Sequence, residues 1–482
     1  MLSLTRLTHR RFVFGRPSYF IFIFFAGFSI HIPAAEWTLS KQVSLDTSFS
    51  DNINLTDTNP ASDFFTSLSP GFVLQGKGSG LTVDLAYAPR LLYYLHETSN
   101  NRIDNNLQAN AEAEVFREHL FVDFTSSARQ EFIDPFAARG DVENTTDNIQ
   151  TTYSYAVSPL LRSNLGRNAE LELRLTNTGV FYSREGSDSY SYEADFQIRS
   201  RADNPGRTLW STQARKERVE YDSGDDDFSN FSILVGYELT RHWTIELSGG
   251  YEDNNYAASQ ETSGSQWGAF LSWVPTSRTS FRLGIGKHYY GTTPSFEFSH
   301  QSKRSRWTAI YSRELTTSRS DVVNNPVFQF EDPFGEPLTP NTADAGRLGV
   351  DNALPNARVY LSDRLSGQYV LETRRSSLSL NVDYVQREYE GDANEETAVQ
   401  AALDFQHRLT AKTSGNAGVS WRQTDQDITN VSENANRDEE ITVFTGLSRS
   451  LSERINVDLN YQFRNGRDYT ENRVTLGLSS RW

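Results

Sequence analysis

The chain has 482 residues, 62 acidic and 46 basic side chains, a formal net charge of −16, no cysteine and 12% aromatic residues. The absence of cysteine excludes disulfides, thiolate metal sites and cysteine nucleophiles, and the absence of a basic excess argues against a nucleic-acid partner. With 37% hydrophobic residues, the composition is that of a folded chain.

The N-terminus is typical of a secretory signal peptide. Four arginines within residues 1–18 precede an apolar run of 14 residues (19–32), and Pro33-Ala34-Ala35 follows. A membrane-anchor helix is the alternative, but such a helix needs roughly 20 apolar residues. We therefore expect residues 1–35 to be a signal peptide that is cleaved near Ala35.

From about Val43 to the C-terminus, apolar and polar residues alternate with a period of two, which predicts β-strands. The rows include Leu81, Val83, Leu85 and Tyr87; Leu171, Leu173 and Leu175; Trp243, Ile245, Leu247 and Tyr251; and Ile455, Val457, Leu459, Tyr461 and Phe463. Soluble sheets use strands of about five or six residues. These runs last about ten to fifteen, which is long enough for tilted transmembrane strands.

In lipid every backbone N–H and C=O must be paired within the protein, and a closed barrel achieves this without an open edge. The sequence therefore predicts that residues 36–482 form an all-β, transmembrane, antiparallel up-and-down β-barrel in a bacterial outer membrane. The soluble antiparallel sheet is the alternative that the strand length disfavours.

Connections between the strands alternate in length, as in outer-membrane barrels with short periplasmic turns and long external loops. The short turns are 76–80, 117–119, 202–206, 240–242, 275–278, 373–375, 410–412 and 451–454; long loops lie near 53–62, 96–103, 133–147, 183–189, 219–228, 253–264, 316–363, 388–396, 424–438 and 466–470. This count predicts about 22 strands, within a range of about 18 to 24.

Acidic runs in the long loops usually mark a solvated surface, and a calcium site at 222–227 is the weaker alternative because the spacing departs from an EF-hand.

The last strand carries a candidate assembly signal. Val474, Leu476, Leu478 and Ser480 alternate into the terminal Trp482, which resembles the C-terminal signature that outer-membrane barrels present to the barrel assembly machinery. An ordinary edge strand that happens to end in tryptophan is the alternative.

If the apolar rows face lipid, the interleaved polar rows face the lumen. These candidates are Asp84, Arg90, Glu112, Glu114, Glu170, Glu172, Arg174, Glu193, Asp195, Arg199, Glu246, Arg282, Asp383, Asp404 and Asp458. Such a wall suits a hydrated path for neutral or cationic polar solutes, or charges that pair across strands and fill a rigid barrel.

Alternation begins too early for a separate plug domain, so the proline-rich stretch 316–363 is a candidate for an inward-folded constriction, with an external lid as the alternative.

No catalytic, cofactor-binding or metal site is predicted, and we expect a protein that is not an enzyme. The histidines beyond the leader (His96, His119, His242, His288, His300 and His407) are scattered, without metal-ligand spacing. The chain also lacks a nucleophile elbow, a phosphate loop and a dinucleotide fingerprint. A lipid hydrolase assembled from serine and histidine on adjacent strands is the weak alternative.

Several stretches resemble a particular family, the outer-membrane proteins associated with the PEP-CTERM system. They are Asp51 to Leu55 (DNINL), Ser62 to Gly71 (SDFFTSLSPG), Arg358 to Leu365 (RVYLSDRL), Leu378 to Tyr384 (LSLNVDY) and Val419 to Arg422 (VSWR). The resemblance implies a Gram-negative cell, a gene neighbourhood that makes exopolysaccharide, and partners that include outer-membrane lipid and polysaccharide-export components. Two functions stay open: a porin-like channel or export-associated pore, and a non-conducting structural or docking barrel.

Overall fold

The computed structural model describes residues 35–134, 136–201, 207–258, 261–324, 359–390, 395–427 and 437–482. Residues 1–34, which hold nearly all of the expected signal peptide, lie outside the described residues, as does 325–358, which holds most of the expected long loop.

The described chain is built of strands, with one 3-10 turn (Thr98–Asn100) and one short helix, α1 (Ser318–Asn324). The strands are β1 Glu36–Ser50, β2 Asp63–Lys77, β3 Leu81–Tyr87, β4 Arg90–Tyr94, β5 Arg102–Asp104, β6 Leu107–Phe116, β7 Leu120–Phe132, β8 Ile149–Leu165, β9 Ala169–Tyr182, β10 Ser189–Ser200, β11 Thr208–Tyr221, β12 Gly224–Thr240, β13 Trp243–Asn255, β14 Ser263–Thr276, β15 Thr279–His288, β16 Gly291–Gln301, β17 Ser305–Thr317, β18 Val359–Glu372, β19 Ser376–Tyr389, β20 Glu395–Thr410, β21 Thr413–Asp427, β22 Arg437–Ser450, β23 Ile455–Gly466 and β24 Tyr469–Arg481. No helix in these residues is long and apolar enough to cross a bilayer.

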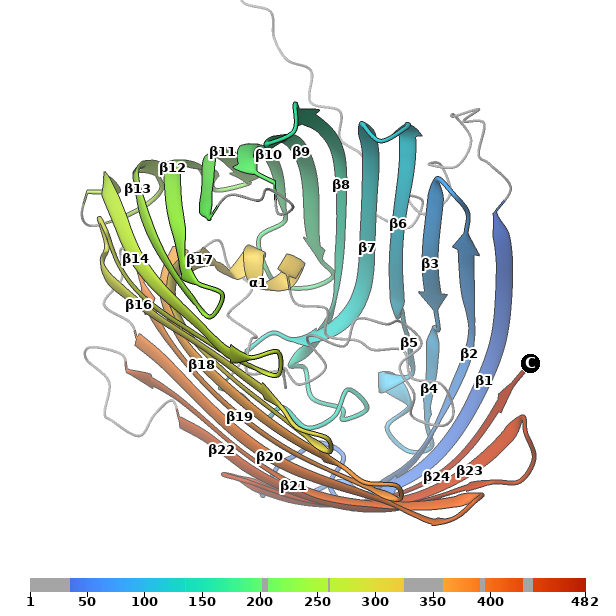
Figure 1. Ribbon diagram of the computed structural model, residues 1–482. Coiled ribbons are helices and arrows are strands. Elements are labelled where there is room, and N and C mark those ends of the chain that lie inside the picture. Colours follow the sequence, from blue (N-terminus) through green and yellow to red (C-terminus); the bar gives the residue numbers. More distant parts are fainter. Residues whose placement is uncertain are drawn as a thin grey trace, which may run out of the picture.

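Antiparallel ladders join each strand to the next around a closed barrel (Figure 1). The ring closes where β1 pairs with β24, from Gln42 opposite Arg481 to Ser50 opposite Arg473. Because β3 and β4 are two parts of one interrupted strand, and β5 and β6 of another, the 24 described segments form 22 barrel strands. The predicted transmembrane barrel of about 22 strands is thus confirmed.

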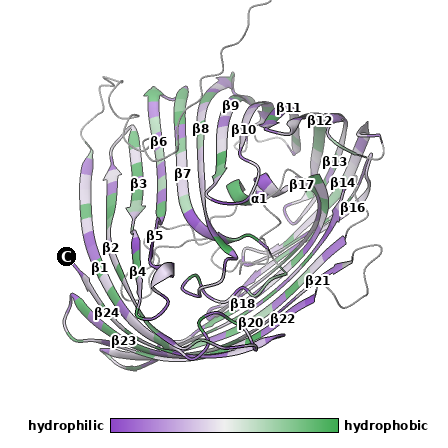
Figure 2. Cartoon of the chain, turned by 180° about the vertical axis from the view of Figure 1, so that it is seen from behind, coloured by the Kyte–Doolittle hydropathy of each residue, from purple (hydrophilic) through white to green (hydrophobic). Residues whose placement is uncertain are grey.

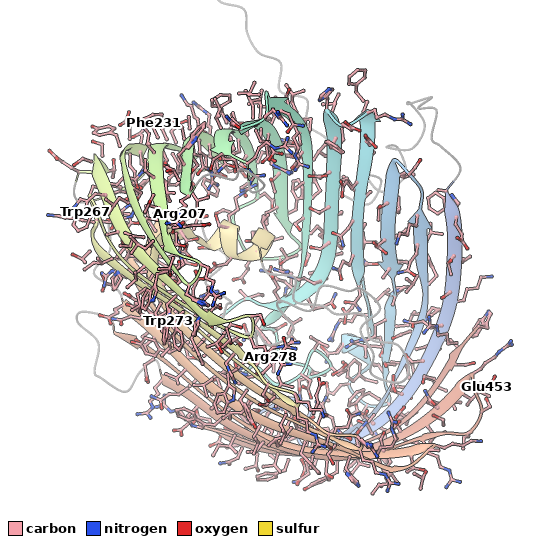
Figure 3. The ribbon with its side chains drawn as sticks, in the orientation of Figure 1. Arg207, Phe231, Trp267, Trp273, Arg278 and Glu453 are labelled. Carbon is pink, nitrogen blue, oxygen red and sulfur yellow. The ribbon has the colours of Figure 1, made fainter. Side chains whose placement is uncertain are left out.

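The two faces of the wall differ as the period of two predicts. Apolar side chains cover the outside: Leu247 is 59% exposed, Phe231 is 46% exposed and Trp267 is 49% exposed. Figure 3 shows Phe231 and Trp267 pointing away from the lumen, and Figure 2 shows the alternating hydropathy along the strands. The intervening polar residues face inward, where other segments of the chain contact them.

The two ends of the barrel follow the expected alternation of short and long connections, with corrections. Further short turns occur at 166–168 and 302–304. The long connections expected near 219–228 and 466–470 are wrong, because the strands continue to two-residue turns at 222–223 and 467–468. At the first of these turns, Gly224 takes a φ of 152°, a conformation that glycine tolerates best.

The acids expected in that loop therefore belong to β12. Asp225 and Asp227 both form ion pairs with Arg218 of β11. Within the described ranges, no group of three or more histidine, aspartate or glutamate side chains is arranged to hold a metal ion.

Adjacent residues near the middle of β13 test the assignment of the two faces. Leu247→Arg places a charge on the lipid face and should lower the free energy of unfolding by about 2 to 4 kcal/mol. Ser248→Arg, the matched control, points to the lumen and should change it by less than about 1 kcal/mol. Urea unfolding in phospholipid vesicles measures both; equal losses would contradict the assignment.

Candidate functional site

The loop between β7 and β8, described at residues 133–134 and 136–148, leaves the wall and runs through the lumen (Figure 1). Its base is fastened because the Asn148 side chain accepts a hydrogen bond from the Asp134 amide (2.6 Å) and donates one to its carbonyl (2.9 Å). Gly140 has a φ of 42°, and a Cβ there would meet Leu55 at 2.4 Å and Asn144 at 2.5 Å. A larger residue therefore cannot form this turn without displacing its neighbours.

Two arginines of the last two strands hold the tip of this loop. The Asp141 carboxylate forms ion pairs of 2.9 Å with both Arg464 of β23 and Arg473 of β24. Glu471 of β24 completes the cluster with ion pairs of 2.7 Å to Arg464 and 2.8 Å to Arg473. Asn144, which has no exposed surface, donates a 3.1 Å hydrogen bond to Glu471. The tip is thus fixed by charge-assisted bonds, the stronger kind of hydrogen bond.

The adjoining part of the loop is attached to β4 and β5. Glu143 pairs with Arg90, and its carbonyl accepts a 2.6 Å hydrogen bond from the Tyr94 hydroxyl. The carbonyl of Val142 accepts a hydrogen bond from Arg102. The β7–β8 loop therefore crosses the lumen from its own strands to β23, β24 and β4.

The loop between β1 and β2 also turns inward and supports this crossing. The Thr145 amide donates to the carbonyl of Ile53 at 3.0 Å. Ile53 packs with Phe65, Leu92 and Tyr94 in a small apolar cluster, in which Ile53 and Tyr94 have no exposed surface. This apolar cluster holds the β1–β2 loop against β2 and β4 on the inside of the wall, and the β7–β8 loop is hydrogen-bonded to it through Ile53 and Tyr94.

A second segment that crosses the lumen is α1, which follows β17 and contacts β8 and β9 on another part of the wall. We call the β7–β8 loop (133–148) and α1 (318–324) the two crossings. Arg319 is 5% exposed and donates 3.0 Å hydrogen bonds to the Ser189 hydroxyl and the Thr178 carbonyl. Its guanidinium also lies 3.6 Å from Glu217 of β11. From β7, Arg129 donates a 2.9 Å hydrogen bond to the carbonyl of Val322.

On its other side α1 remains attached to β18. Tyr360, which has no exposed surface, donates a hydrogen bond to Asp321, and Arg364 lies 4.0 Å from the same carboxylate. The start of the stretch expected to fold inward (316–363) therefore does lie in the lumen. The rest of that stretch, 325–358, lies outside the described residues.

The electrostatics of both crossings depend on burial. Burial lowers the pKa of Arg319 and, together with the nearby Arg422, lowers the pKa of Arg139 to about 9. Burial alone would raise the pKa of Asp141, but Arg464 and Arg473 outweigh it and hold that pKa below its ordinary value of 3.8. The aspartate is therefore ionised at neutral pH, and its charge holds the loop against the wall.

None of these contacts reaches β12 to β16. The luminal rows of that section carry small polar side chains, among them Ser232, Ser248, Ser272 and Ser295, which the register of the ladders places on one face. The ion pair between Glu246 and Arg282 (2.5 Å) lies in the same rows. Among the described residues, the contacts given above for the two crossings thus lie on other strands than those of this polar wall.

The sequence-predicted luminal residues are spread around the barrel rather than gathered at the crossings. Among them Arg90 contacts the β7–β8 loop. Several others pair with neighbouring strands: Glu170 and Glu172 with Arg162 and Arg199, Arg174 with Asp123, Glu193 with Arg215, and Asp195 with Gln213. Asp84 accepts a hydrogen bond from Gln75, and Glu114 accepts one from the backbone of Glu118. Charge pairing across strands, one of the two interpretations of the polar rows, describes much of this wall.

The remaining candidates lie in the luminal rows of other strands. Glu112 lies opposite Asp123, Asp383 opposite Ser366, Asp404 opposite Gly418, and Asp458 opposite Gly477. The proposed assembly residues Val474, Leu476 and Leu478 are on the outer face of β24, and Trp482 exchanges backbone hydrogen bonds with Lys41 of β1. Their recognition by the assembly machinery stays a prediction.

The residues that hold the crossings were not among the candidates predicted from the sequence. Arg464 and Arg473 alternate with the apolar rows of the last two strands, so the period of two already placed them in the lumen. The acidic partners of these arginines also left a signal in the sequence, because Asp141 and Glu143 lie two residues apart in the β7–β8 loop. Nothing local in the sequence specified that these charges meet.

Comparison with solved structures agrees with this architecture. The siderophore receptor PirA from Acinetobacter baumannii superposes with a TM-score of 0.53 at 9% identity, over 92% of this chain and 80% of that one. The ferric enterobactin receptor PfeA from Pseudomonas aeruginosa, solved with enterobactin, gives 0.50 at 10% identity, over 94% and 82%. The chain is an outer-membrane β-barrel protein. No protein-family model and no curated protein matches its sequence.

The depressed pKa of Asp141 gives a pH dependence with a defined sign. Its contribution to holding the β7–β8 loop is complete above pH 3.8 and is lost as the pH falls through the lowered value. Acidification below pH 3.8 should therefore release the loop and raise the ionic conductance of the reconstituted protein.

Asp141→Asn should reproduce part of this release at neutral pH. Glu471 continues to neutralise both arginines, so the expected destabilisation of the loop is about 1.5 to 3 kcal/mol. Asp225→Asn, which removes an exposed ion pair with Arg218, is the matched control and should leave conductance unchanged. Identical conductance of wild type and Asp141→Asn at neutral pH would contradict the role of this carboxylate.

Proposed function

We propose that this outer-membrane barrel is a narrow channel for polar solutes, partly filled by its own chain. The observation that supports it is the division of the lumen: in the described part of the chain, the contacts given above for the β7–β8 loop and α1 lie on β4, β5, β7 to β11, β17, β18, β23 and β24, away from β12 to β16. Solutes would pass beside the crossings, along the polar section of the wall.

The chemistry of that section supports polar, uncharged or weakly cationic cargo. Its luminal rows carry serines and the Glu246–Arg282 pair, and Glu252 and Glu297 lie in the same rows. The wall therefore offers hydrogen bonds and a modest excess of acidic groups. At the long-loop end, the Tyr256 and Tyr289 hydroxyls lie 3.0 Å apart, and Asn254 donates to Tyr289 at 3.1 Å. Such groups suit a hydroxyl-rich solute, which presents both donors and acceptors.

We further propose that the channel serves exopolysaccharide export, as the family resemblance of the sequence implies. Outer-membrane lipid, the barrel assembly machinery and export components would be its partners, and the protein itself would carry out no catalysis. This assignment rests on the resemblance and on the hydroxyl-rich mouth of the path.

A closed structural or docking barrel is the second candidate. The buried ion pairs that hold both crossings support it, because Arg319, Arg464 and Arg473 are each at most 5% exposed and each has acidic partners. Breaking such a pair is costly, so the crossings are rigid, and rigid crossings suit a filled barrel as well as a narrow pore.

Modification of single cysteines separates the two candidates, because the native chain has no cysteine to interfere. In planar bilayers, Ser248→Cys should lose most of its current when a charged methanethiosulfonate reagent reacts with it, since the side chain lines the proposed path. Leu247→Cys, its neighbour on the lipid face, is the matched control and should keep its current. A wild-type barrel without any current would favour the structural candidate.

The export assignment is tested in cells. A strain that lacks this protein should retain polymer inside the envelope and release less of it, and the wild-type gene should restore release. Restoration by a gene carrying Ser248→Cys should be blocked when the reagent is added to the cells. Unchanged release from the deleted strain would contradict the export role while leaving the channel proposal to the conductance measurement.

A further inference from the structure

The wall of the barrel has a seam where β3 passes into β4. Pro89, which has no N–H to donate, lies between the two strands. On one side of the break, β3 pairs with β6 from Leu81 opposite Ala113 to Tyr87 opposite Leu107. On the other side, the β4–β5 ladder has three residue pairs, from Arg90 opposite Asp104 to Leu92 opposite Arg102.

Beyond this point the barrel is joined less completely than elsewhere. The β6–β7 ladder ends at Leu107 opposite Ala128, although β7 continues to Phe132. Between β5 and β7, both fully described, no backbone ladder forms. A side-chain bond connects the two sides, from Gln130 Nε2 to the Asn105 carbonyl at 3.0 Å. An open strand edge is costly in lipid, so this seam needs cover on both sides.

On the luminal side the β7–β8 loop provides this cover. Tyr94 and Arg102, which belong to the two short strands at the seam, hydrogen-bond the carbonyls of Glu143 and Val142. The inner surface of the seam is thus closed by the same loop that narrows the lumen.

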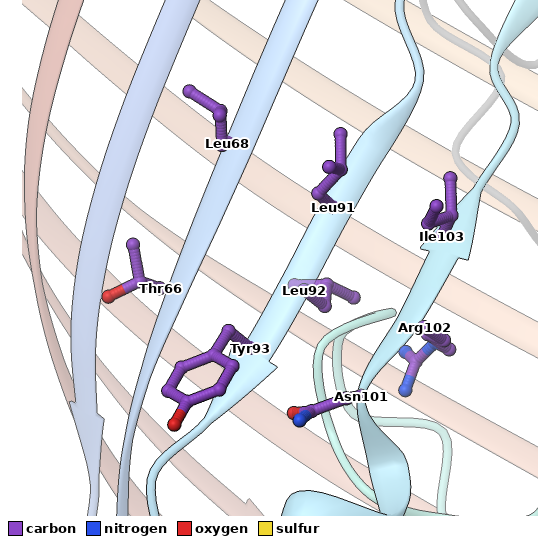
Figure 4. Close-up of a pocket in the computed structure, with 8 residues that line it drawn as sticks. All are labelled: Thr66, Leu68, Leu91, Leu92, Tyr93, Asn101, Arg102 and Ile103. Carbon is purple, nitrogen blue, oxygen red and sulfur yellow. The ribbon is translucent and has the colours of Figure 1, made fainter.

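On the outer side the wall is hollowed. A cavity of about 410 Å³ is lined by Thr66, Leu68, Leu91, Leu92, Tyr93, Asn101, Arg102 and Ile103 (Figure 4). Leu68, Leu91, Tyr93 and Ile103 are on the exposed outer rows, and Ile103 is 63% exposed.

We propose that this hollow is a binding site for one alkyl chain of a bilayer amphiphile. The outer rows of this barrel face the hydrocarbon of the membrane, where acyl chains are the matter available to fill an apolar cavity. Thr66 and Leu68 are close to the long-loop end of β2, which begins at Asp63, so the hollow opens toward the outer leaflet. Asn101, which is exposed beside the hollow, supplies a polar group at its edge.

The site differs from the ordinary lipid-facing wall in its shape. Continuous strands such as β13 present a regular row of apolar side chains to lipid, whereas the short β4–β5 ladder leaves room between its outer residues. A chain seated there would occupy one defined site, so its binding should saturate. Lipid around the rest of the barrel binds without saturation.

Photolabelling tests this difference. The full chain is reconstituted in phosphatidylcholine nanodiscs with trace palmitic acid that carries a diazirine, and labelled peptides are mapped after illumination. Labelling of residues 91–103 should saturate and should be competed by excess palmitate. Leu91→Trp, which fills the hollow, should reduce it at least about tenfold, whereas Leu247→Trp, on the regular wall of β13, should not.

Ile103→Ser provides a second variant that removes an apolar lining side chain without adding bulk, and the heat-modifiable mobility of each variant reports barrel assembly. Saturable labelling that an assembled Leu91→Trp or Ile103→Ser variant loses supports the site. Labelling spread evenly over exposed aliphatic residues, without competition by palmitate, would overturn it, as would full labelling of both assembled variants.

Discussion

Each of the 22 barrel strands crosses a medium that offers no hydrogen bonds, and the pairing of its backbone groups follows from that constraint. Closure of β1 on β24, from Gln42 opposite Arg481 to Ser50 opposite Arg473, removes the last open edge of the ring. With the backbone satisfied by its neighbours, each strand can place apolar side chains in lipid and polar ones in the lumen. The seam at Pro89 is the place where this rule is least completely met, and it is there that a loop closes the inside and a hollow opens on the outside.

The same constraint explains why the lumen can be filled with charge. Because the lipid-facing rows supply the apolar contacts, the inner rows are free to carry arginine and acid pairs whose burial would be costly unless each charge has a partner. Arg464, Arg473, Glu471 and Asp141 satisfy one another across β23, β24 and the β7–β8 loop. A comparable pair, Arg387 with Glu396 at 2.9 Å, stiffens the adjacent wall between β19 and β20. These pairs give the crossings a defined position rather than simply adding bulk.

Much of the fold could be predicted from the sequence because the signals for it are local. The period of two identified strands and their faces, and the spacing of turns gave the strand number. Local signals failed where strands outlast their expected ends, as at β11 and β12, whose ladder continues to Tyr221 opposite Gly224 despite the acidic residues. The crossings could not be predicted in full because they depend on partners far apart in the chain: Asp141 meets Arg464 and Arg473 only after the barrel has closed. At the start of the long 316–363 stretch, α1 contacts β8 and β9, while the inward fold of the whole stretch stays a prediction; the contribution of the β7–β8 loop was not predicted.

The proposed narrow channel depends most on a lumen that is partly occupied by the protein's own chain. Polymer exclusion in planar bilayers measures this directly, by recording which neutral polyethylene glycols enter the pore of the wild-type protein and reduce its conductance. A narrow path beside β12 to β16, left by the β7–β8 loop and α1, predicts a small ionic conductance that only the shortest polymers reduce. A large conductance that long polymers reduce as effectively as short ones would describe an empty barrel and contradict it.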